Sequence, residues 1–506
     1  ATDGSADGGV FEEVAQGVAI IEAIKLGGFP AEVQLWRDDL FGAVTEKLDY
    51  LVDQVSRISG AIRCPILEPE CFFNAVDKDM KGEWDCLTSL PIVMGENGDP
   101  APGIVTTHDQ FAISFDSDEQ IKKVEWLLAT PNEKAARERF KLCTQDQWNY
   151  AAAKRALASA KWKTEIVPVD YRPFDQRVTA YNNQIAVHLR DRVMRHMLTG
   201  DNLGIISTRQ RSQATGIWTN AFVASQIIES TSISNKTKEI NYLFPLWLKP
   251  SVGENHRRPN FDRNWAIGVA QALKLSYEDG IPRGEQGSLG KDFIKPKAEQ
   301  IGLLDTPWDG RGDLAKSFGP RDLFDYIYAV LHAPSYRSRY AEFLKSEFPR
   351  IPTPGSRALF VHLVPLGREL VALHLLKPDE APVLKTPEIR FGGTGEARVG
   401  KGYPEYENGK VKINASRWFE DVPKATWEFH VGGYQPCEKW LKDRAAKGGK
   451  KQSDGRVLTD EDVLHYRRMV TALTETRRIM AEIDQLIDKH GGWPRAFKIG
   501  DDKEAN

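Results

Sequence analysis

The side chains best suited to chemistry in this sequence are arginines and glutamines clustered between positions 187 and 213. This segment holds five arginines against two aspartates. In the major groove of DNA, arginine can donate two hydrogen bonds to guanine, and glutamine can pair in the same way with adenine. We therefore predict that Arg190 contacts phosphate and that four neighbouring side chains contact bases: Arg209, Gln210, Arg211 and Gln213. A solvated helix face followed by a polar loop would have the same composition, and this alternative stays open.

A second basic segment runs from position 436 to position 456, with seven Lys or Arg residues against three acidic ones. Such a run neutralises phosphates and positions a protein on DNA without distinguishing one sequence from another. The predicted phosphate contacts in this segment are Lys442, Arg444, Lys450 and Lys451. A flexible surface loop without a ligand explains the same residues.

Motifs for catalysis or metal binding are incomplete. The stretch "GEARVGKG", Gly395 to Gly402, nearly matches a phosphate-binding loop, but Gly402 stands where a hydroxyl must bind magnesium. The histidines are scattered, and no G-x-S-x-G nucleophile motif is present. The five cysteines lie at irregular spacing without the close pairs of a zinc site, so we expect reduced, mostly buried thiols. We predict no catalytic residue and no metal ligand.

Length and charge limit the class of protein. A chain of 506 residues is too long for one simple core, so we expect two to four lobes. Because the formal net charge is only −3, any affinity for a polyanion must come from local patches. No apolar run is long enough to cross a bilayer, which argues against a membrane partner. The opening "ATDGSADGG" has neither a signal peptide's pattern nor an initiator Met, so we expect a cytoplasmic chain that is a fragment or a trimmed piece.

Helix and strand patterns occur in separate clusters along the chain, which predicts an α+β fold of several lobes with mixed or antiparallel sheets. The stretch "GIVTTHDQFAISFD" has the alternation of paired strands, and "IAVHLRDRVMRHMLT" resembles a helix. Pro334 should open the second of two helices between residues 322 and 348. Asn408-Gly409 predicts a hairpin turn. Thr459 and Asp462 can form the capping box of a long closing helix.

The order of several blocks resembles a known family over residues 10 to 486. The most specific blocks are "YRPFDQR" and "GGYQPCEKWLKDR". The chain is similar to the C-terminal part of type ISP restriction–modification enzymes and related N6-adenine DNA methyltransferases. The resemblance implies a parent enzyme with nuclease, helicase, S-adenosylmethionine-dependent methyltransferase and target recognition parts, in a prokaryotic cytoplasm at the nucleoid. It also implies that Gly432 and Gly433 form a turn and that Trp440 packs against the closing helix.

The catalytic signatures of that family are missing from this sequence. Its methyltransferases carry a Gly-rich cofactor loop and an N-P-P-Y/F motif that holds the flipped adenine. This chain contains no Pro-Pro dipeptide, so we expect no cofactor site in it and doubt that it is an enzyme alone. The expected units are the end of a methyltransferase core and a connecting helix (1–58), a first recognition lobe (59–250), a linker and helical region (251–350) and a C-terminal specificity lobe with the closing helix (351–506).

The resulting hypothesis is a module that recognises duplex DNA and places one adenine for an upstream methyltransferase, with S-adenosylmethionine bound only by the parent enzyme. Two alternatives from other classes stay open. One is a complete methyltransferase with a degenerate cofactor site. The other is a scaffold of DNA modification machinery, in which the helices at 322–348 and 459–490 bind other proteins.

Overall fold

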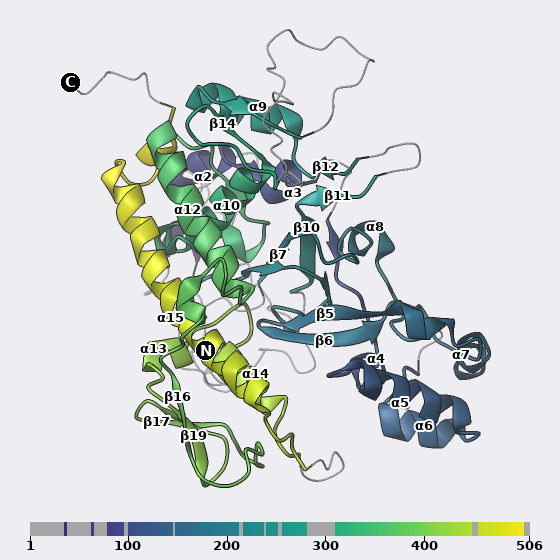
Figure 1. Cartoon of the computed structure of the whole chain (residues 1–506). Helices are drawn as coiled ribbons and strands as arrows, with labels where there is room; N and C mark the ends of the chain where they lie inside the picture. Colours follow the sequence, from purple (N-terminus) through teal and green to yellow (C-terminus); the bar gives the residue numbers. More distant parts are fainter. Residues whose placement is uncertain are drawn as a thin grey trace, which may run out of the picture.

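The computed structural model describes residues 78–95, 100–144, 147–211, 216–236, 239–250, 256–280, 309–447 and 454–499. It also places the backbone of two short antiparallel strands, β1 (Leu35–Arg37) and β2 (Ile62–Cys64). Apart from β1, the expected end of a methyltransferase core and its connecting helix lie outside the described residues. The described part is a mixed α+β structure, as the separate clusters of helices and strands predicted (Figure 1).

A four-stranded antiparallel sheet lies at the centre of the molecule, and we call it the central sheet. Its strands, in spatial order, are β4 (Ala101–Pro102), β10 (Asn241–Pro245), β7 (Gly204–Thr208) and β8 (Ala221–Ala224). Every residue of β7 and β8 is buried. Runs of branched apolar residues form such strands because they pack well on a pleated surface that is covered on both faces.

A smaller sheet beside the central sheet contains the "YRPFDQR" block. It consists of β6 (Asp175–Ala180), β5 (Ile166–Arg172) and β9 (Ile227–Ile228). β5 and β6 form an antiparallel hairpin with an irregularity between Asp170 and Arg172, and β9 runs parallel to β5. The turn of this hairpin includes Phe174, which has a positive φ of 62°.

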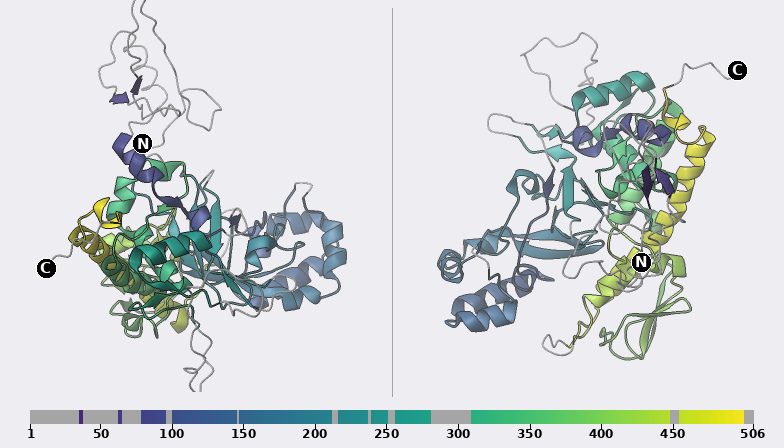
Figure 2. Two further views of the ribbon diagram at one scale, coloured as in Figure 1. Left: turned by 90° about the horizontal axis from the view of Figure 1, so that it is seen from above. Right: turned by 180° about the vertical axis from the view of Figure 1, so that it is seen from behind.

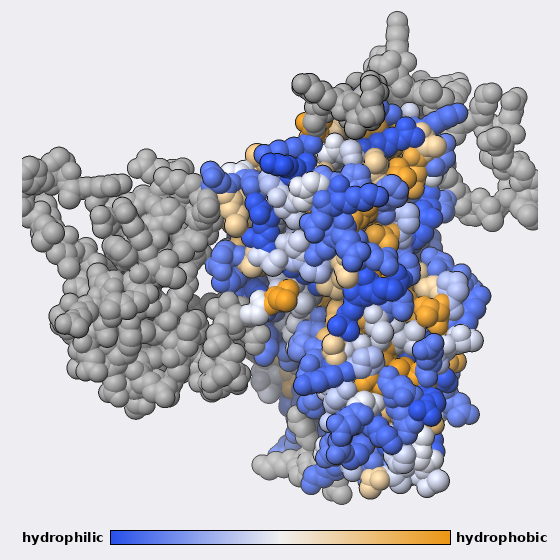
Figure 3. Space-filling view, turned by 90° about the vertical axis from the view of Figure 1, so that its left-hand side faces the viewer, coloured by the Kyte–Doolittle hydropathy of each residue, from blue (hydrophilic) through white to orange (hydrophobic). Residues whose placement is uncertain are grey.

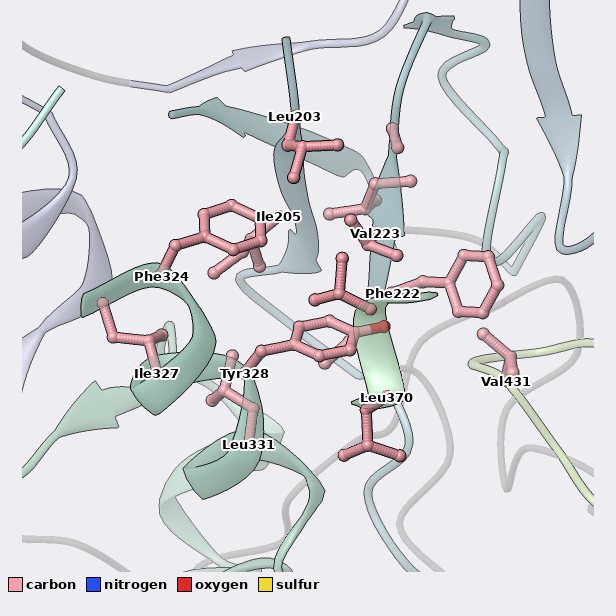
Figure 4. Packing of buried hydrophobic residues seen from close by; sticks show 14 of the residues in the cluster. Leu203, Ile205, Phe222, Val223, Phe324, Ile327, Tyr328, Leu331, Leu370 and Val431 are labelled. Carbon is pink, nitrogen blue, oxygen red and sulfur yellow. The ribbon is translucent and has the colours of Figure 1, made fainter. Parts of the chain in front are cut away.

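One face of the central sheet is covered by α10 (Pro320–His332) and α12 (Arg357–His374). Two further helices, α11 (Pro334–Arg339) and α15 (Asp460–Lys489), pack against these helices. Pro334 is the first residue of α11, as predicted. Figure 4 shows Phe324, Tyr328 and Leu331 of α10 pointing among sheet residues such as Phe222 and toward Leu370 of α12.

Close contact between α10 and α12 depends on a glycine. A Cβ atom at Gly367 would lie 1.8 Å from the carbonyl oxygen of Asp325, so no larger residue fits without separating the helices. Almost every residue of α10 is buried as a result. This packing leaves α10 little surface for contacts with another protein.

The long helix α15 runs along the outside of the molecule (Figures 1 and 2). Its capping box is present: the Asp462 amide donates to Thr459 Oγ1 at 3.1 Å, and the Thr459 amide donates to Asp462 Oδ2 at 3.0 Å. The face of the molecule that α15 presents is mostly hydrophilic, with small hydrophobic patches (Figure 3). On that helix Arg478 pairs with Glu475 and Glu482. A hydrophilic outer face does not favour the scaffold alternative.

A helical lobe with its own small core stands beside the hairpin (Figure 1, lower right). It comprises α4 (Asp109–Ala112), α5 (Ser117–Ala129), α6 (Glu133–Phe140) and α7 (Tyr150–Leu157). The prediction of paired strands over residues 103–116 was wrong. The chain turns at Thr107, where φ is 56°. It then forms α4, because Phe111 is fully buried in the core of this lobe. Only isolated bridges, such as Ser114 to Val178, remain of the expected pairing.

The C-terminal part adds a second four-stranded antiparallel sheet. Its strands, in spatial order, are β16 (Arg390–Gly393), β19 (Arg417–Glu420), β18 (Lys410–Lys412) and β17 (Glu405–Glu407). The β17–β18 turn confirms the predicted hairpin, since Asn408 and Gly409 both have positive φ. Two short helices follow, α13 (Lys424–Trp427) and α14 (Pro436–Lys442).

Short elements complete the described structure. They are α2 (Lys78–Asp85), α3 (Leu90–Val93), α8 (Asp191–Met194), α9 (Arg263–Leu273), β3 (Thr88–Ser89), β11 (Trp247–Leu248), β12 (Arg258–Pro259), β13 (Ser276–Tyr277), β14 (Ser317–Phe318) and β15 (Arg350–Ile351), with 3-10 turns at 161–165, 343–345, 382–384 and 495–497. The helix expected over 185–199 is reduced to α8. His188 pairs with Val105 through both backbone hydrogen bonds, and Arg190 is left-handed, so no helix can begin earlier.

One hydrophobic core extends from residue 84 to residue 496 and crosses the boundaries proposed at 250 and 350. Even the stretch interpreted as a linker contributes, because α9 buries Val269 and Leu273 in it. The domain limits therefore stay predictions, with a continuous core across two of them. No helix in the described part of the chain is long and apolar enough to span a membrane.

Candidate nucleic-acid interface

Arg209 and Gln210 directly follow β7 and are exposed. Neither side chain has an ion pair or a hydrogen bond to another described residue. Two exposed apolar side chains lie at the same end of the central sheet: Ile217 is 65% exposed and Ile240 is 48% exposed. An exposed guanidinium, an amide and apolar side chains at one edge are the groups that can recognise base edges and thymine methyl groups.

Arg211 has a different environment from its neighbours. Its amide donates to the carbonyl of Lys345 at 2.9 Å, and its guanidinium donates to the carbonyl of Gly216 at 2.6 Å. Burial lowers the pKa of Arg211, while nearby Glu239 opposes that shift. Arg211 thus links the end of β7 to Lys345 and Gly216. Gln213, the fourth predicted base contact, lies outside the described residues.

Arg190 is exposed, but it lies at the other end of the central sheet. It precedes α8, and the nearby ring of His196 accepts a hydrogen bond from the Lys249 amide beyond the end of β10. Arg209 follows the opposite end of β7, a strand of five residues that spans roughly 13 Å. The structure therefore does not bring Arg190, the predicted phosphate contact of the 187–213 segment, beside the predicted base contacts Arg209 and Gln210.

The two most specific blocks of the sequence, "YRPFDQR" and "GGYQPCEKWLKDR", meet in space. Their arginines and aromatic rings alternate in one continuous stack. Arg172 lies 3.8 Å from the ring of Tyr171 and 5.3 Å from that of Tyr434. Arg444 lies 3.5 Å from the ring of Trp440. Guanidinium groups over aromatic faces gain electrostatic attraction when water is excluded, so this stack joins the hairpin to α14.

Phe115 of the helical lobe completes the stack from the other side. Arg177 is 3.8 Å from its ring, Arg456 is 3.9 Å away and Arg444 is 5.1 Å away. Three segments distant in sequence are thereby fixed to one another: the end of α4, the hairpin and the chain after α14.

A buried carboxylate neutralises this arginine cluster. Asp175 Oδ2 accepts from Arg177 Nη2 at 2.6 Å, and Asp175 Oδ1 accepts from Arg444 Nη2 at 3.0 Å. Asp175 is 2% exposed. Burial by itself raises the pKa of such a carboxyl, but the two guanidinium groups outweigh it and hold the pKa of Asp175 well below its usual value. The side chain of Asp175 is therefore ionised in the folded protein.

The predicted phosphate contacts of the second basic segment lie in contrasting places. Lys442 is exposed at the end of α14 and pairs with Glu438 at 2.6 Å. Arg444 is 7% exposed, with one edge bound to Asp175, while its Nε has no hydrogen-bond acceptor among the described residues. Lys450 and Lys451 lie outside the described residues.

The turn expected at the start of this block is present. Gly432 has a φ of 55°, and its amide donates to the carbonyl of Thr219 at 2.9 Å. A Cβ atom at Gly432 would lie 2.2 Å from the carbonyl oxygen of Ile233. Trp440 stacks on His465 of α15 at 5.4 Å, which confirms its packing against the closing helix.

Sequence reasoning selected only Arg444 as a site residue of this cluster. It missed the other members, which are Phe115, Tyr171, Arg172, Asp175, Arg177, Tyr434 and Arg456. The available signal was the alternation of aromatic residues with arginine and aspartate in "YRPFDQR". That pattern does not reveal the partner segment, which comes from elsewhere in the sequence.

Metal and thiol chemistry have little support in the described part of the chain. No group of three or more His, Cys, Asp or Glu residues there could hold a metal ion. Cys143 and Cys437 are buried free thiols, as expected, but Cys86 is exposed. Cys71 and the side chain of Cys64 lie outside the described residues.

Residues 99–482 match a protein family described as the Type ISP C-terminal specificity domain. The chain belongs to this family. The match includes both the exposed end of β7 and every residue of the arginine–aromatic stack. No curated protein matches the chain significantly.

Solved structures share the fold of this specificity domain. The DrdV–DNA complex superposes with a TM-score of 0.58 at 16% identity, over 89% of this chain and 43% of that chain. A nuclease-deletion mutant of the Type ISP restriction–modification enzyme LlaGI, in complex with a DNA substrate mimic, gives 0.56 at 17% identity, over 90% of this chain and 33% of that chain. The ATP-dependent Type ISP enzyme LlaBIII bound to DNA gives 0.58 at 16%, over 92% and 28%. The specificity domain thus spans less than half the length of these proteins.

Proposed function

We propose that this specificity domain binds duplex DNA, recognises a short asymmetric sequence in the major groove, and presents one adenine to a methyltransferase in the parent enzyme. The observation that carries the proposal is the match to the specificity-domain family over residues 99–482. Two structures of the same fold are named as DNA complexes, DrdV with DNA and LlaBIII bound to DNA. The exposed polar and apolar groups at the end of β7 supply suitable chemistry for base recognition.

Within this proposal, Arg209 and Gln210 contact base edges, and Gln213 keeps its predicted role beside them. Arg211 also stays a proposed base contact, and in this structure its guanidinium donates to the Gly216 carbonyl. A bidentate contact to a base discriminates by about 1–3 kcal/mol against the wrong base pair. Ile217 and Ile240 would add apolar contact with thymine methyl groups.

The proposed phosphate contacts remain Arg190, Lys442, Arg444, Lys450 and Lys451. Their role is to hold the duplex in register, and each contributes to affinity without distinguishing sequences. Methyl transfer needs S-adenosylmethionine, and we propose that the parent enzyme binds this cofactor outside the present chain. The N-P-P-Y/F motif that would hold a flipped adenine is missing from this sequence.

The test is a selection from a randomised duplex pool with the purified chain at moderate salt, followed by sequencing of the retained molecules. We expect enrichment of one short motif that contains an adenine. If duplexes are retained but no motif is enriched, the chain binds the phosphate backbone, and sequence recognition by this chain alone is rejected. Absence of retention even at low salt would reject DNA binding.

A second measurement separates the proposal from a complete methyltransferase. Labelled S-adenosylmethionine should not bind the chain in equilibrium dialysis, with or without the selected duplex. Saturable binding of the cofactor would favour the methyltransferase alternative.

A further inference from the structure

A surface groove lies between the helical lobe and the segment that follows α14, which stand opposite each other in Figure 1. One wall comes from α4, α5, α6 and the residue after α6, Lys141. The other wall comes from the β5–β6 hairpin and from residues 443–447 and 454–456. The stack around Phe115 forms its floor, so the groove is part of the packed structure rather than a gap between loose segments.

The lining of this groove carries an excess of positive charge. It contains seven Lys or Arg residues and five Asp or Glu residues. Some of these charges pair within the lining: Glu119 pairs with Lys123 at 3.0 Å and with Arg456 at 3.8 Å, and Asp443 lies 3.8 Å from Arg177. The lining as a whole still has two more basic than acidic side chains.

Two of the basic side chains, Arg139 and Lys141, lie on the helical wall. Both are exposed, and neither has an ion pair within the described residues. Arg139 lies 4.4 Å from the ring of Trp126, which fixes its guanidinium beside the groove. Lys141 ends α6 in a left-handed conformation with a φ of 50°. A positive charge held in place without a counterion is suited to an anionic ligand.

The opposite wall offers the guanidinium of Arg456. Its side chain is 43% exposed and lies 3.9 Å from the ring of Phe115. On the helical side, burial lowers the pKa of Lys123, and a nearby anion would oppose that shift.

The aromatic residues of the groove are not available for stacking with bases. Phe115 is in contact with Arg177 and Arg456, and Tyr171 is in contact with Arg172 and Arg177. A ligand entering the groove meets guanidinium and ammonium groups instead of open rings. The chemistry of the lining therefore favours phosphate over a nucleobase.

We propose that this groove binds the phosphodiester backbone of duplex DNA, with Arg139 and Lys141 on one wall and Arg444 and Arg456 on the other. The inference rests on the proposed function and adds a binding site on the helical lobe. Arg139 and Lys141 lie outside both basic segments that the sequence analysis identified. Sequence recognition at the end of β7 and backbone binding in the groove are then separate tasks of separate surfaces.

The test compares two double variants of the full chain in titrations of labelled duplex at several salt concentrations. Arg139→Gln with Lys141→Asn removes two groove charges, and asparagine tolerates the left-handed conformation at position 141. The control is Lys122→Gln with Arg155→Gln, two exposed residues of α5 and α7 that do not line the groove. We expect the groove variant to lower the slope of log affinity against log salt by about 2, equally for selected and random duplexes, because each phosphate contact contributes about 0.9.

An unchanged slope in the groove variant, or the same loss in the control, would overturn the inference. If the unmodified chain binds duplex while the groove variant keeps its slope, only the groove fails. If the unmodified chain binds no duplex at low salt, the proposed function fails with it. A second measurement on the unmodified chain is independent of folding: duplex should slow chemical acetylation of Lys141 and leave that of Lys122 unchanged. Equal rates at Lys141 with and without duplex would also reject the site.

Discussion

Two arginine-rich regions of this molecule look alike in sequence and differ completely in environment. After β7, Arg209 is exposed and has no counterion within the described residues. In the stack between the hairpin and α14, Arg177 and Arg444 are 8% and 7% exposed and share the carboxylate of Asp175. In the first region Arg209 and Gln210 are exposed to solvent, whereas the arginines of the second region are mostly committed to the fold.

The difference shows that basic composition does not by itself identify a DNA contact. A guanidinium becomes structural when aromatic faces and a buried carboxylate surround it, because desolvation is then compensated within the protein. It remains available to a ligand when its charge faces solvent. Arg444 belongs to the structural kind, because it is 7% exposed and one edge of its guanidinium is bound to Asp175. Four predictions test this division between the two regions.

The largest expected effect is the loss of the carboxylate from the stack. Asp175→Asn removes the carboxylate that Arg177 and Arg444 share and leaves Arg177 with only the more distant Asp443 at 3.8 Å. We expect a loss of about 3–5 kcal/mol in the free energy of unfolding, measured by urea denaturation. The control is Asp379→Asn, where the side chain is 93% exposed and pairs only with Lys385, and the expected change is below about 0.5 kcal/mol. A loss below about 1 kcal/mol at Asp175 would show that the stack is not a structural unit.

A second prediction uses basic groups that the core keeps neutral. Burial, followed by repulsion from Arg337, lowers the pKa of His374 to about 3, and burial also lowers the pKa of His332. The unfolded chain binds a proton at each histidine near pH 6.5, so unfolding takes up protons below that pH and stability falls as pH falls.

The expected loss is about 1.4 kcal/mol per pH unit for each histidine, or about 2 kcal/mol each between pH 6.5 and pH 5. Urea denaturation at several pH values measures it. His374→Gln should reduce the loss of unfolding free energy per pH unit by the share of one histidine. His256→Gln, at an exposed position, should leave that loss unchanged. A stability that is flat between pH 5 and pH 7 would contradict the prediction.

The third prediction concerns the exposed region. Arg209→Lys keeps the positive charge but loses the planar guanidinium that can donate two hydrogen bonds to guanine. We expect it to lose about 1–3 kcal/mol of discrimination at one base pair of the selected site, with the salt dependence unchanged. Competition titrations with singly substituted duplexes measure this. A uniform loss over all duplexes would assign Arg209 to the backbone.

The smallest expected effect is at Lys442. Lys442→Gln should weaken all duplexes alike and lower the salt slope by about 1. Its exposed pair with Glu438 contributes less than about 0.5 kcal/mol to stability. The control is Lys424→Gln, which breaks an equivalent exposed pair with Glu428 and should leave binding unchanged. If the Arg209 and Lys442 variants behave alike, the proposed division of roles is wrong.

Local features of the fold were determined by the sequence itself. The capping box of Thr459 and Asp462, the start of α11 at Pro334 and the Asn408-Gly409 turn were all predicted correctly. Each depends on residues within a few positions of one another, where backbone preferences and short-range hydrogen bonds decide the conformation. The α+β class followed in the same way from the pattern of apolar residues.

Burial of the arginines was decided only by the tertiary structure. Asp175 and Arg444, whose ion pair anchors the stack, lie 269 positions apart in the sequence. The region after Gly103 was also mispredicted, because Phe111 packs in a lobe whose other members come from later in the chain. Charge and alternation describe a side chain's own preferences, whereas its exposure depends on which distant segments pack against it. The sequence therefore indicated the family and its candidate side chains, and the packing of distant segments decided which of them are exposed and which are buried.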